Sequence, residues 1–345
     1  MSTRTTTFTK LAAPTTRSVA SPPVDQVVAA LPASADLAET YGLWRRAAWT
    51  LTALLFGVLV AGFWNAAAVD GFGRNVVAGT TIGDTQELAG TFANNGFGFG
   101  AVFAWVAGLA ATFTACNCVV YAMLPGLACT AEGAADAAAS RRAAWRALGA
   151  FASMVLLVGA AYGMFIGFLG SDGVRSFNER PVRLALAQAV FTSIGLVMLV
   201  WGAIAFGYLG ALTRRLSPVT RSFFSMAGTK AALMGLLVGS FAIGRPFPVF
   251  HEFLTYAAAA HSPLYGALVM ALHGLGEIAL MVLLFSVLVF AFGRRLTRWA
   301  SRKPWQPALL TAVALTAGGA YFVYYWGVAI AFDLGRWGFR LGWYG

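Results

Sequence analysis

Two stretches of this chain share a pattern: residues 108–116 read GLAATFTAC, and residues 235–246 read GLLVGSFAIGRP. Each has a glycine followed five or six residues later by phenylalanine, and each lies in the first of three consecutive apolar segments. Because each group holds an odd number of segments, the two groups would have opposite orientations in a bilayer. Inverted repeats of this kind often place a functional site where they meet, marked by glycine or proline breaks. Pro125 and Pro246 provide such breaks.

The composition indicates a membrane protein. The 345 residues are 59% hydrophobic and only 11% charged, against roughly a quarter charged in soluble domains, and the mean hydropathy is +0.71. These values exclude a disordered chain, a coiled coil and an ordinary soluble enzyme. Seven apolar segments are long enough to cross the bilayer: 47–68, 99–127, 146–170, 184–212, 229–250, 262–292 and 307–331. We therefore predict an all-α polytopic membrane protein of about seven transmembrane helices, an N-terminal helix plus an inverted repeat of two three-helix units.

The chain divides into four regions. Residues 1–46 are expected to form a disordered or amphipathic cytoplasmic segment, although their scarcity of acidic residues is also typical of an organellar transit peptide. Residues 47–98 hold the extra transmembrane helix and an outer loop of polar turns. Residues 99–331 hold the two repeats, and residues 332–345 an outer C-terminal tail.

The distribution of basic residues predicts the orientation. With the N-terminus in the cytoplasm, 17 of the 24 Lys and Arg residues fall on the inner side, as the positive-inside rule requires. The C-terminus is then outside. Because the net charge of +11 arises from helix ends and not from a basic face, we expect a lipid bilayer as partner and no nucleic acid.

Three motifs resemble a known family. The first repeat has Gly108, Phe113, Cys116 and Leu124-Pro125, the second reads Phe241-Ala-Ile-Gly244-Arg245-Pro246-Phe247-Pro248, and Gly274-Leu275-Gly276 follows. Over residues 99–331 the chain resembles the transmembrane electron carriers typified by the cytochrome c biogenesis protein CcdA and the membrane domain of the thiol:disulfide interchange protein DsbD.

The resemblance implies a function in the bacterial cytoplasmic membrane. In that family one cysteine on each repeat takes part in thiol–disulfide exchange. Reducing equivalents pass from a thioredoxin-like protein in the cytoplasm to an outer thiol or disulfide acceptor, and no cofactor is needed. Cys116 matches the first of these cysteines, whereas Phe247 or Pro248 occupies the second position and Ala115 replaces a family proline. The chain therefore resembles a degenerate member, and whether it is an enzyme stays open.

Cys116 and Cys118 are the candidate catalytic residues. Two sulfurs at this spacing can form a disulfide only in a non-helical stretch, which the break at Pro125 would allow. Three alternatives remain: the cysteines pack as small apolar residues, the fold serves as a non-redox subunit or assembly factor in a membrane complex, or the pair carries a soft metal such as Cu(I) with help from Met123 or His273. Cys129 is expected to be a packing residue.

Three further ionisable residues are candidates. His273 and Glu277 share a face of one predicted membrane helix, where they either relay protons or bind a metal, or else form a hydrogen-bonded pair that fastens helices. Arg245 either favours the thiolate form of a nearby cysteine, or caps its helix, or pairs with Glu252.

Overall fold

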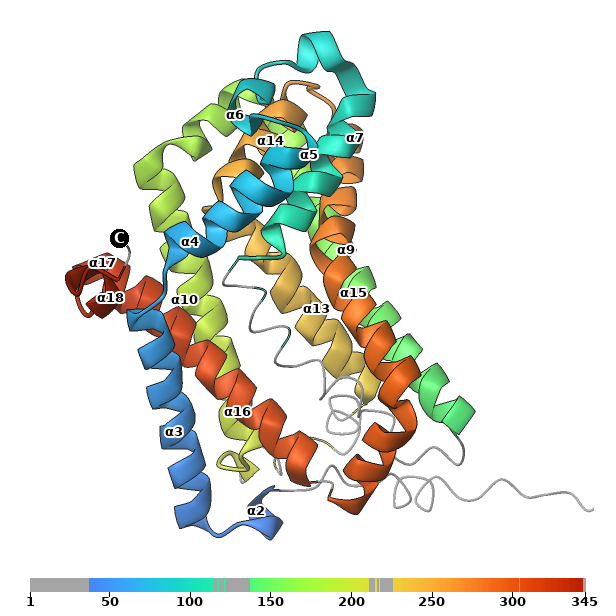
Figure 1. The fold of residues 1–345 in the computed structure, drawn as a ribbon, viewed down its shortest axis with the longest axis vertical. Helices are drawn as coiled ribbons and strands as arrows, with labels where there is room; N and C mark the ends of the chain where they lie inside the picture. Colours follow the sequence, from blue (N-terminus) through green and yellow to red (C-terminus); the bar gives the residue numbers. More distant parts are fainter. Residues whose placement is uncertain are drawn as a thin grey trace, which may run out of the picture. The chain divides into compact units, whose positions relative to one another are not determined.

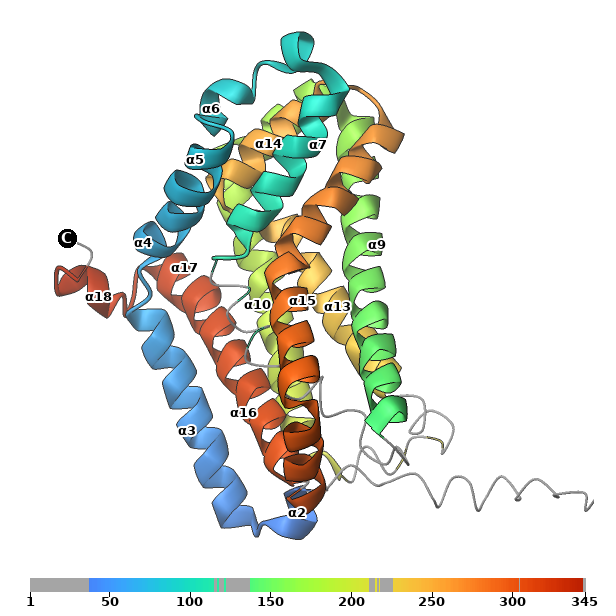
Figure 2. The ribbon, with the colours of Figure 1, turned by 45° about the vertical axis from the view of Figure 1, so that its right-hand side comes forward.

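The computed structural model describes residues 37–114, 117, 121, 137–210, 215, 217, 226–303 and 305–343. Within these ranges every regular element is helical (Figures 1 and 2). The longer helices are α3 (Leu43–Gly62), α7 (Phe92–Ala111), α9 (Ala137–Asn178), α10 (Arg180–Ala205), α13 (Ala227–Gly244), α14 (Pro248–Ala258), α15 (Pro263–Arg302) and α16 (Trp305–Phe322). The shorter elements are α2 (Leu37–Thr40), α4 (Ala66–Gly71), the π-helix η1 (Phe72–Ala78), α5 (Gly79–Thr81), α6 (Thr85–Leu88), the π-helix η2 (Val323–Ala329), α17 (Ile330–Phe332) and α18 (Trp337–Arg340).

Five helical stretches of the described residues are long and apolar enough to cross a membrane: Leu43–Gly62, Arg141–Phe177, Arg180–Ala205, Pro263–Phe292 and Trp305–Phe332. Helices α13 and α14 together qualify as a sixth, bent span. The prediction of an all-helical fold with several helices long and apolar enough to cross a membrane is thus confirmed for the described residues. The expected segment 99–127 is described continuously only to Thr114, so the seven-helix layout stays a prediction.

The outward faces of these helices are apolar. Phe168 of α9 is 78% exposed and Leu268 of α15 is 67% exposed. Contiguous apolar surface of this kind is unfavourable in water and is the normal surface of a helix in lipid.

Two prolines cause the bend between α13 and α14. A proline disfavours helical geometry in the residue before it, and Arg245 and Phe247, which precede Pro246 and Pro248, have ψ values of 119° and 124°. Pro248 then begins α14, a position where its missing N–H costs no helical hydrogen bond. The two helix axes differ by 80°. The break expected from the sequence at Pro246 is therefore present.

Glycines bring the long helices into close contact in two reciprocal pairs. A Cβ on Gly163 of α9 would meet the carbonyl oxygen of Gly266 of α15, and a Cβ on Gly266 would meet that of Gly163. Gly195 of α10 and Gly319 of α16 make the same reciprocal contact, at 3.0 and 2.8 Å. Such close approach is how membrane helices gain packing energy.

The two glycines of the shared sequence pattern make corresponding contacts. Gly108 of α7 lies against α15, where a Cβ would meet the main chain of His273, Gly276 and Glu277. Gly235 of α13 lies against the main chain of Phe151 in α9. Helix α7 therefore packs on α15 as α13 packs on α9.

Residues 66–88 are mostly helical, so the expected outer loop of polar turns is wrong for this part of the chain. Helices α4, η1, α5 and α6 extend from the end of α3 towards α7 and α14 (Figure 2). A Cβ on Gly73 would touch Ala110 of α7, and its next neighbour is the ring of Phe247. Ala78 and Thr85 are buried, which shows that the segment packs on the membrane helices through small side chains.

Candidate functional site

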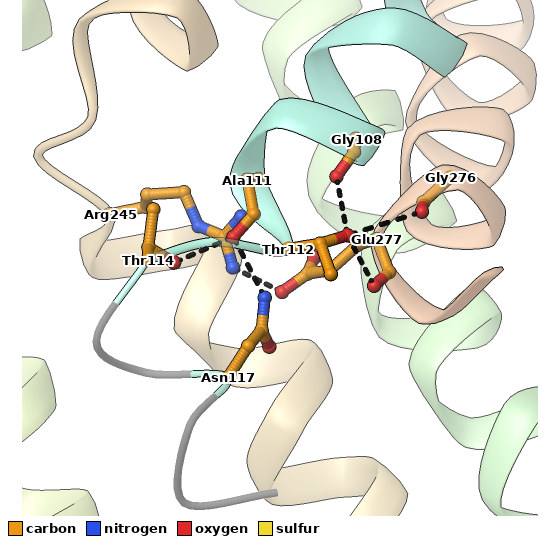
Figure 3. Close-up of polar contacts among 8 residues, drawn as sticks. All are labelled: Gly108, Ala111, Thr112, Thr114, Asn117, Arg245, Gly276 and Glu277. Atoms are coloured by element: carbon orange, nitrogen blue, oxygen red, sulfur yellow. Dashed lines mark hydrogen bonds and ion pairs between the residues drawn. The ribbon is translucent and has the colours of Figure 1, made fainter. Parts of the chain in front are cut away.

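A buried ion pair joins the broken helix to α15. Arg245 is the C-cap of α13 and is 1% exposed, and Glu277 of α15 is 4% exposed. Nη2 of Arg245 donates to Oε1 of Glu277 (Figure 3). Burying either charge alone would be very unfavourable. The pair therefore holds the break against α15.

The alternative in which Arg245 pairs with Glu252 is wrong. Glu252 lies in α14, accepts a hydrogen bond of 2.5 Å from the Thr85 hydroxyl, and is 3.8 Å from Arg74. The 80° bend carries α14 in a new direction from the end of α13. Glu252, the carboxylate closest to Arg245 in the sequence, therefore binds the 66–88 segment. Arg245 pairs instead with Glu277 of α15.

The end of α7 is attached to the same place. The Thr112 hydroxyl is 3.0 Å from the main-chain oxygen of Glu277, to which it donates, and it also lies 3.3 Å from the oxygen of Gly108 and 3.5 Å from that of Gly276. Three elements, α7, α13 and α15, thus meet around one buried polar centre (Figure 3).

Asn117 belongs to this centre and stands between Cys116 and Cys118 in the sequence. It is 4% exposed, and its side-chain amide donates to the carbonyl of Ala111 at 2.8 Å. The Thr114 hydroxyl donates to the same carbonyl at 2.7 Å. The main-chain N–H of Thr114 also donates to this oxygen, at 3.1 Å, so three donors converge on one carbonyl at the end of α7.

His273 lies one helical turn before Glu277 and is 1% exposed. Its ring stacks on Phe253 at 5.5 Å between centroids and lies 5.0 Å from the ring of Phe250, which also contacts the guanidinium of Arg245. The ring lies near the main chain of Ala104, but neither nitrogen has a hydrogen-bond partner of normal geometry among the described residues. The expected His273–Glu277 hydrogen-bonded pair is therefore absent from this part of the structure.

Asp70 of α4 also interacts electrostatically with Arg245. Burial raises the pKa of Asp70 from 3.8 to about 6, and the positive charge of Arg245 opposes this rise. Asp70 is thus a second carboxyl group near the guanidinium of Arg245, and it comes from the segment that the sequence assigned to a loop.

Sequence reasoning missed Thr112, Asn117 and Asp70. Thr112 and Asn117 are polar residues inside a long apolar segment, a signal that would have identified them. Asp70 carried no such signal, because it lies outside the apolar segments.

Several sequence-predicted residues lie outside the described ranges: Cys116, Cys118, Cys129, Met123 and Pro125. Their roles stay predictions. Among the residues that the structure describes, no group of three or more His, Cys, Asp or Glu side chains is arranged to hold a metal ion.

Phe247 and Pro248, one of which the sequence resemblance predicted to stand where the family has its second cysteine, are both described. Phe247 is 1% exposed and belongs to the same apolar core as Phe250 and Phe253. Phe247 is therefore a core side chain, whereas Pro248 is half-buried.

No protein-family model, curated protein or solved structure matches this chain.

Proposed function

We propose that this protein is a membrane carrier of reducing equivalents with Cys116 and Cys118 as its redox pair, built on an inverted repeat like that of the CcdA and DsbD family. It lies in the bacterial cytoplasmic membrane with the N-terminus inside and the C-terminus outside. A thioredoxin-like protein reduces it from the cytoplasm, and an outer disulfide receives the electrons.

The helix contacts support the inverted repeat. A two-fold relation between the repeats would exchange α7 with α13, α9 with α15, and α10 with α16. It would map the Gly195–Gly319 contact between α10 and α16 onto itself. It would also exchange the contact of Gly108 with α15 for that of Gly235 with α9.

The position of Asn117 carries the functional proposal. Asn117 is buried at the centre where the end of α7 meets Arg245 and Glu277. Cys116 and Cys118 directly precede and follow Asn117 in the sequence, and this adjacency is the reason for assigning them the redox role. Inverted-repeat membrane proteins place their functional groups at such a seam.

The reaction balances as two successive exchanges. A cytoplasmic dithiol attacks the Cys116–Cys118 disulfide, its two sulfurs become a disulfide, and Cys116 and Cys118 become thiols with two electrons and two protons. The thiols then attack an outer disulfide, which is reduced to two thiols while the Cys116–Cys118 disulfide forms again. Thiolate is the attacking species in each step.

The burial of Phe247 favours a second candidate, a non-redox membrane subunit or assembly factor on the same fold. A fully buried phenylalanine at the position of the family's second cysteine cannot exchange electrons. In this alternative the polar centre serves only to hold the helices together.

Thiol trapping distinguishes the two candidates. The purified full-length protein is equilibrated with oxidised glutathione, or with reduced thioredoxin, then denatured and labelled with a maleimide that adds a fixed mass to each free thiol. We expect one labelled thiol in the oxidised sample and three in the reduced sample. A Cys129→Ser variant should still gain two labels on reduction, whereas Cys116→Ser and Cys118→Ser should abolish the internal disulfide. Equal labelling in both samples would exclude the redox proposal and leave the structural role.

A further inference from the structure

The chain turns at the end of its last apolar span. The span Trp305–Phe332 is followed by Asp333 and Gly335, which have positive φ values of 50° and 68°, and then by the short helix α18. A Cβ on Gly335 would meet the hydroxyl of Tyr324 in η2. The segment 333–343 therefore changes direction after the span and stays in contact with it.

Trp337 attaches this segment to a second span. Its indole ring occupies the space beside Gly62, the last residue of α3, where a Cβ would collide with the ring. The centroid of the indole lies 6.0 Å from the ring of Phe63 and 5.9 Å from the ring of Tyr324, on which it stacks. The segment 333–343 is thus docked where two spans end, on the outside of the helix bundle (Figures 1 and 2).

The length of α3 indicates the depth of this end in a bilayer. Its 20 residues extend about 30 Å at roughly 1.5 Å per residue, which matches the ~30 Å hydrocarbon core of a bilayer. Arg45 and Arg46 stand at the beginning of α3, where a headgroup layer would contact them. Gly62 and the segment docked on it then lie near the opposite headgroup layer.

The exposed surface of the segment is rich in large apolar side chains. Leu341 is 74% exposed and Trp343 is 68% exposed, and more than half of the surface of Leu334 and Phe339 is exposed. Clustered apolar surface of this kind marks a site of contact with a protein or a membrane. Because the segment continues the surface at which two membrane spans end, the contact that this position offers is lipid. Tryptophan is also enriched at the membrane–water interface.

The charges of the segment are few and partly paired. It contains one aspartate and two arginines, a net charge of +1. Nη1 of Arg336 is 3.4 Å from Oδ1 of Asp333, and Arg340 donates to the main-chain oxygen of Asp333 at 3.3 Å. A single net charge attracts anionic lipid only weakly, so burial of the apolar side chains dominates the interaction with a bilayer.

We infer that residues 333–343 form an interfacial anchor, which inserts its exposed apolar side chains into the boundary between the headgroups and the acyl chains of a phospholipid bilayer. Because Trp337 joins the anchor to both α3 and η2, it fixes the ends of two spans at one depth. The inference does not depend on the redox proposal.

Photocrosslinking identifies what the segment contacts. The photoreactive amino acid p-benzoylphenylalanine, which bonds covalently to nearby C–H groups under ultraviolet light, is incorporated in place of Trp343 in the full-length protein. The protein is reconstituted into vesicles of phosphatidylethanolamine and phosphatidylglycerol, irradiated, and analysed by mass spectrometry. The same experiment at Leu341, which is equally exposed, repeats the measurement with every tryptophan in place.

Two further positions serve as matched controls. Leu268 is exposed within the span Pro263–Phe292 and reports contact with acyl chains. Glu87 is an exposed charged residue outside the spans and reports the yield without such contact. We expect the yield of phospholipid adduct at positions 341 and 343 to be comparable with that at 268 and several-fold above that at 87.

Two results would overturn the inference. A crosslinked dimer in place of the lipid adduct would make the segment an interface between two copies of the chain. A lipid yield at positions 341 and 343 no higher than at 87 would place the segment in water. No thiol takes part in these readouts, so neither result bears on the redox proposal.

Discussion

Replacing Glu277 by glutamine tests the buried ion pair directly. The substitution keeps the shape of the side chain and removes its charge, leaving Arg245 at 1% exposure without its closest counter-ion. Breaking one partner of a buried pair costs about 3–5 kcal/mol. Asp70 still interacts with Arg245, so we expect the lower end of this range, about 3 kcal/mol.

The assay is thermal unfolding of the full-length protein in detergent. At roughly 2–4 °C per kcal/mol, Glu277→Gln should lower the unfolding temperature by about 6–12 °C. Glu87→Gln is the matched control, because Glu87 is exposed and surface substitutions usually change stability by less than about 0.5 kcal/mol.

A double variant completes the experiment. Replacing both partners by apolar residues, Arg245→Met with Glu277→Leu, removes the unpaired charge and should recover much of the lost stability. If Glu277→Gln unfolds at the wild-type temperature, then Arg245 does not depend on this carboxylate, and our account of the polar centre is refuted.

Two further predictions concern packing and pH. Gly108→Ala should destabilise the protein by about 1–3 kcal/mol, because the new Cβ would meet the main chain of α15. The control is Gly149→Ala, at a helical glycine with open space around it, which should be neutral or stabilising. If the two variants unfold at the same temperature, the close contact between α7 and α15 at Gly108 is contradicted. Asp70 has a folded pKa of about 6, above its value in the unfolded chain, so its ionisation opposes folding at pH 7 and stability should rise as the pH falls from 6 towards 4. Asp70→Asn should raise stability at pH 7 by up to about 3 kcal/mol and flatten that part of the pH profile, and an unchanged profile would show that Asp70 is not buried as described.

The polar centre could be only partly anticipated from the sequence. Glu277, His273 and Arg245 stand out because charged and polar residues are rare inside apolar segments. The partner of Arg245 did not follow, since the sequence suggested only Glu252, seven residues away, and the pairing with Glu277 depends on how α15 packs against the bend.

The amino-acid sequence by itself determined that the chain is a helical membrane protein, because long apolar segments with few charges are stable only where lipid surrounds them. It also determined the break at Pro246, because proline acts on its own neighbours along the chain. Tertiary structure alone decided that residues 66–88 fold as helices against α7 and α14, and that α7, α13 and α15 share one buried centre. Those outcomes depend on contacts between residues far apart in the sequence, such as Gly108 with the main chain of α15. A local sequence pattern does not specify which distant helix a segment will pack against.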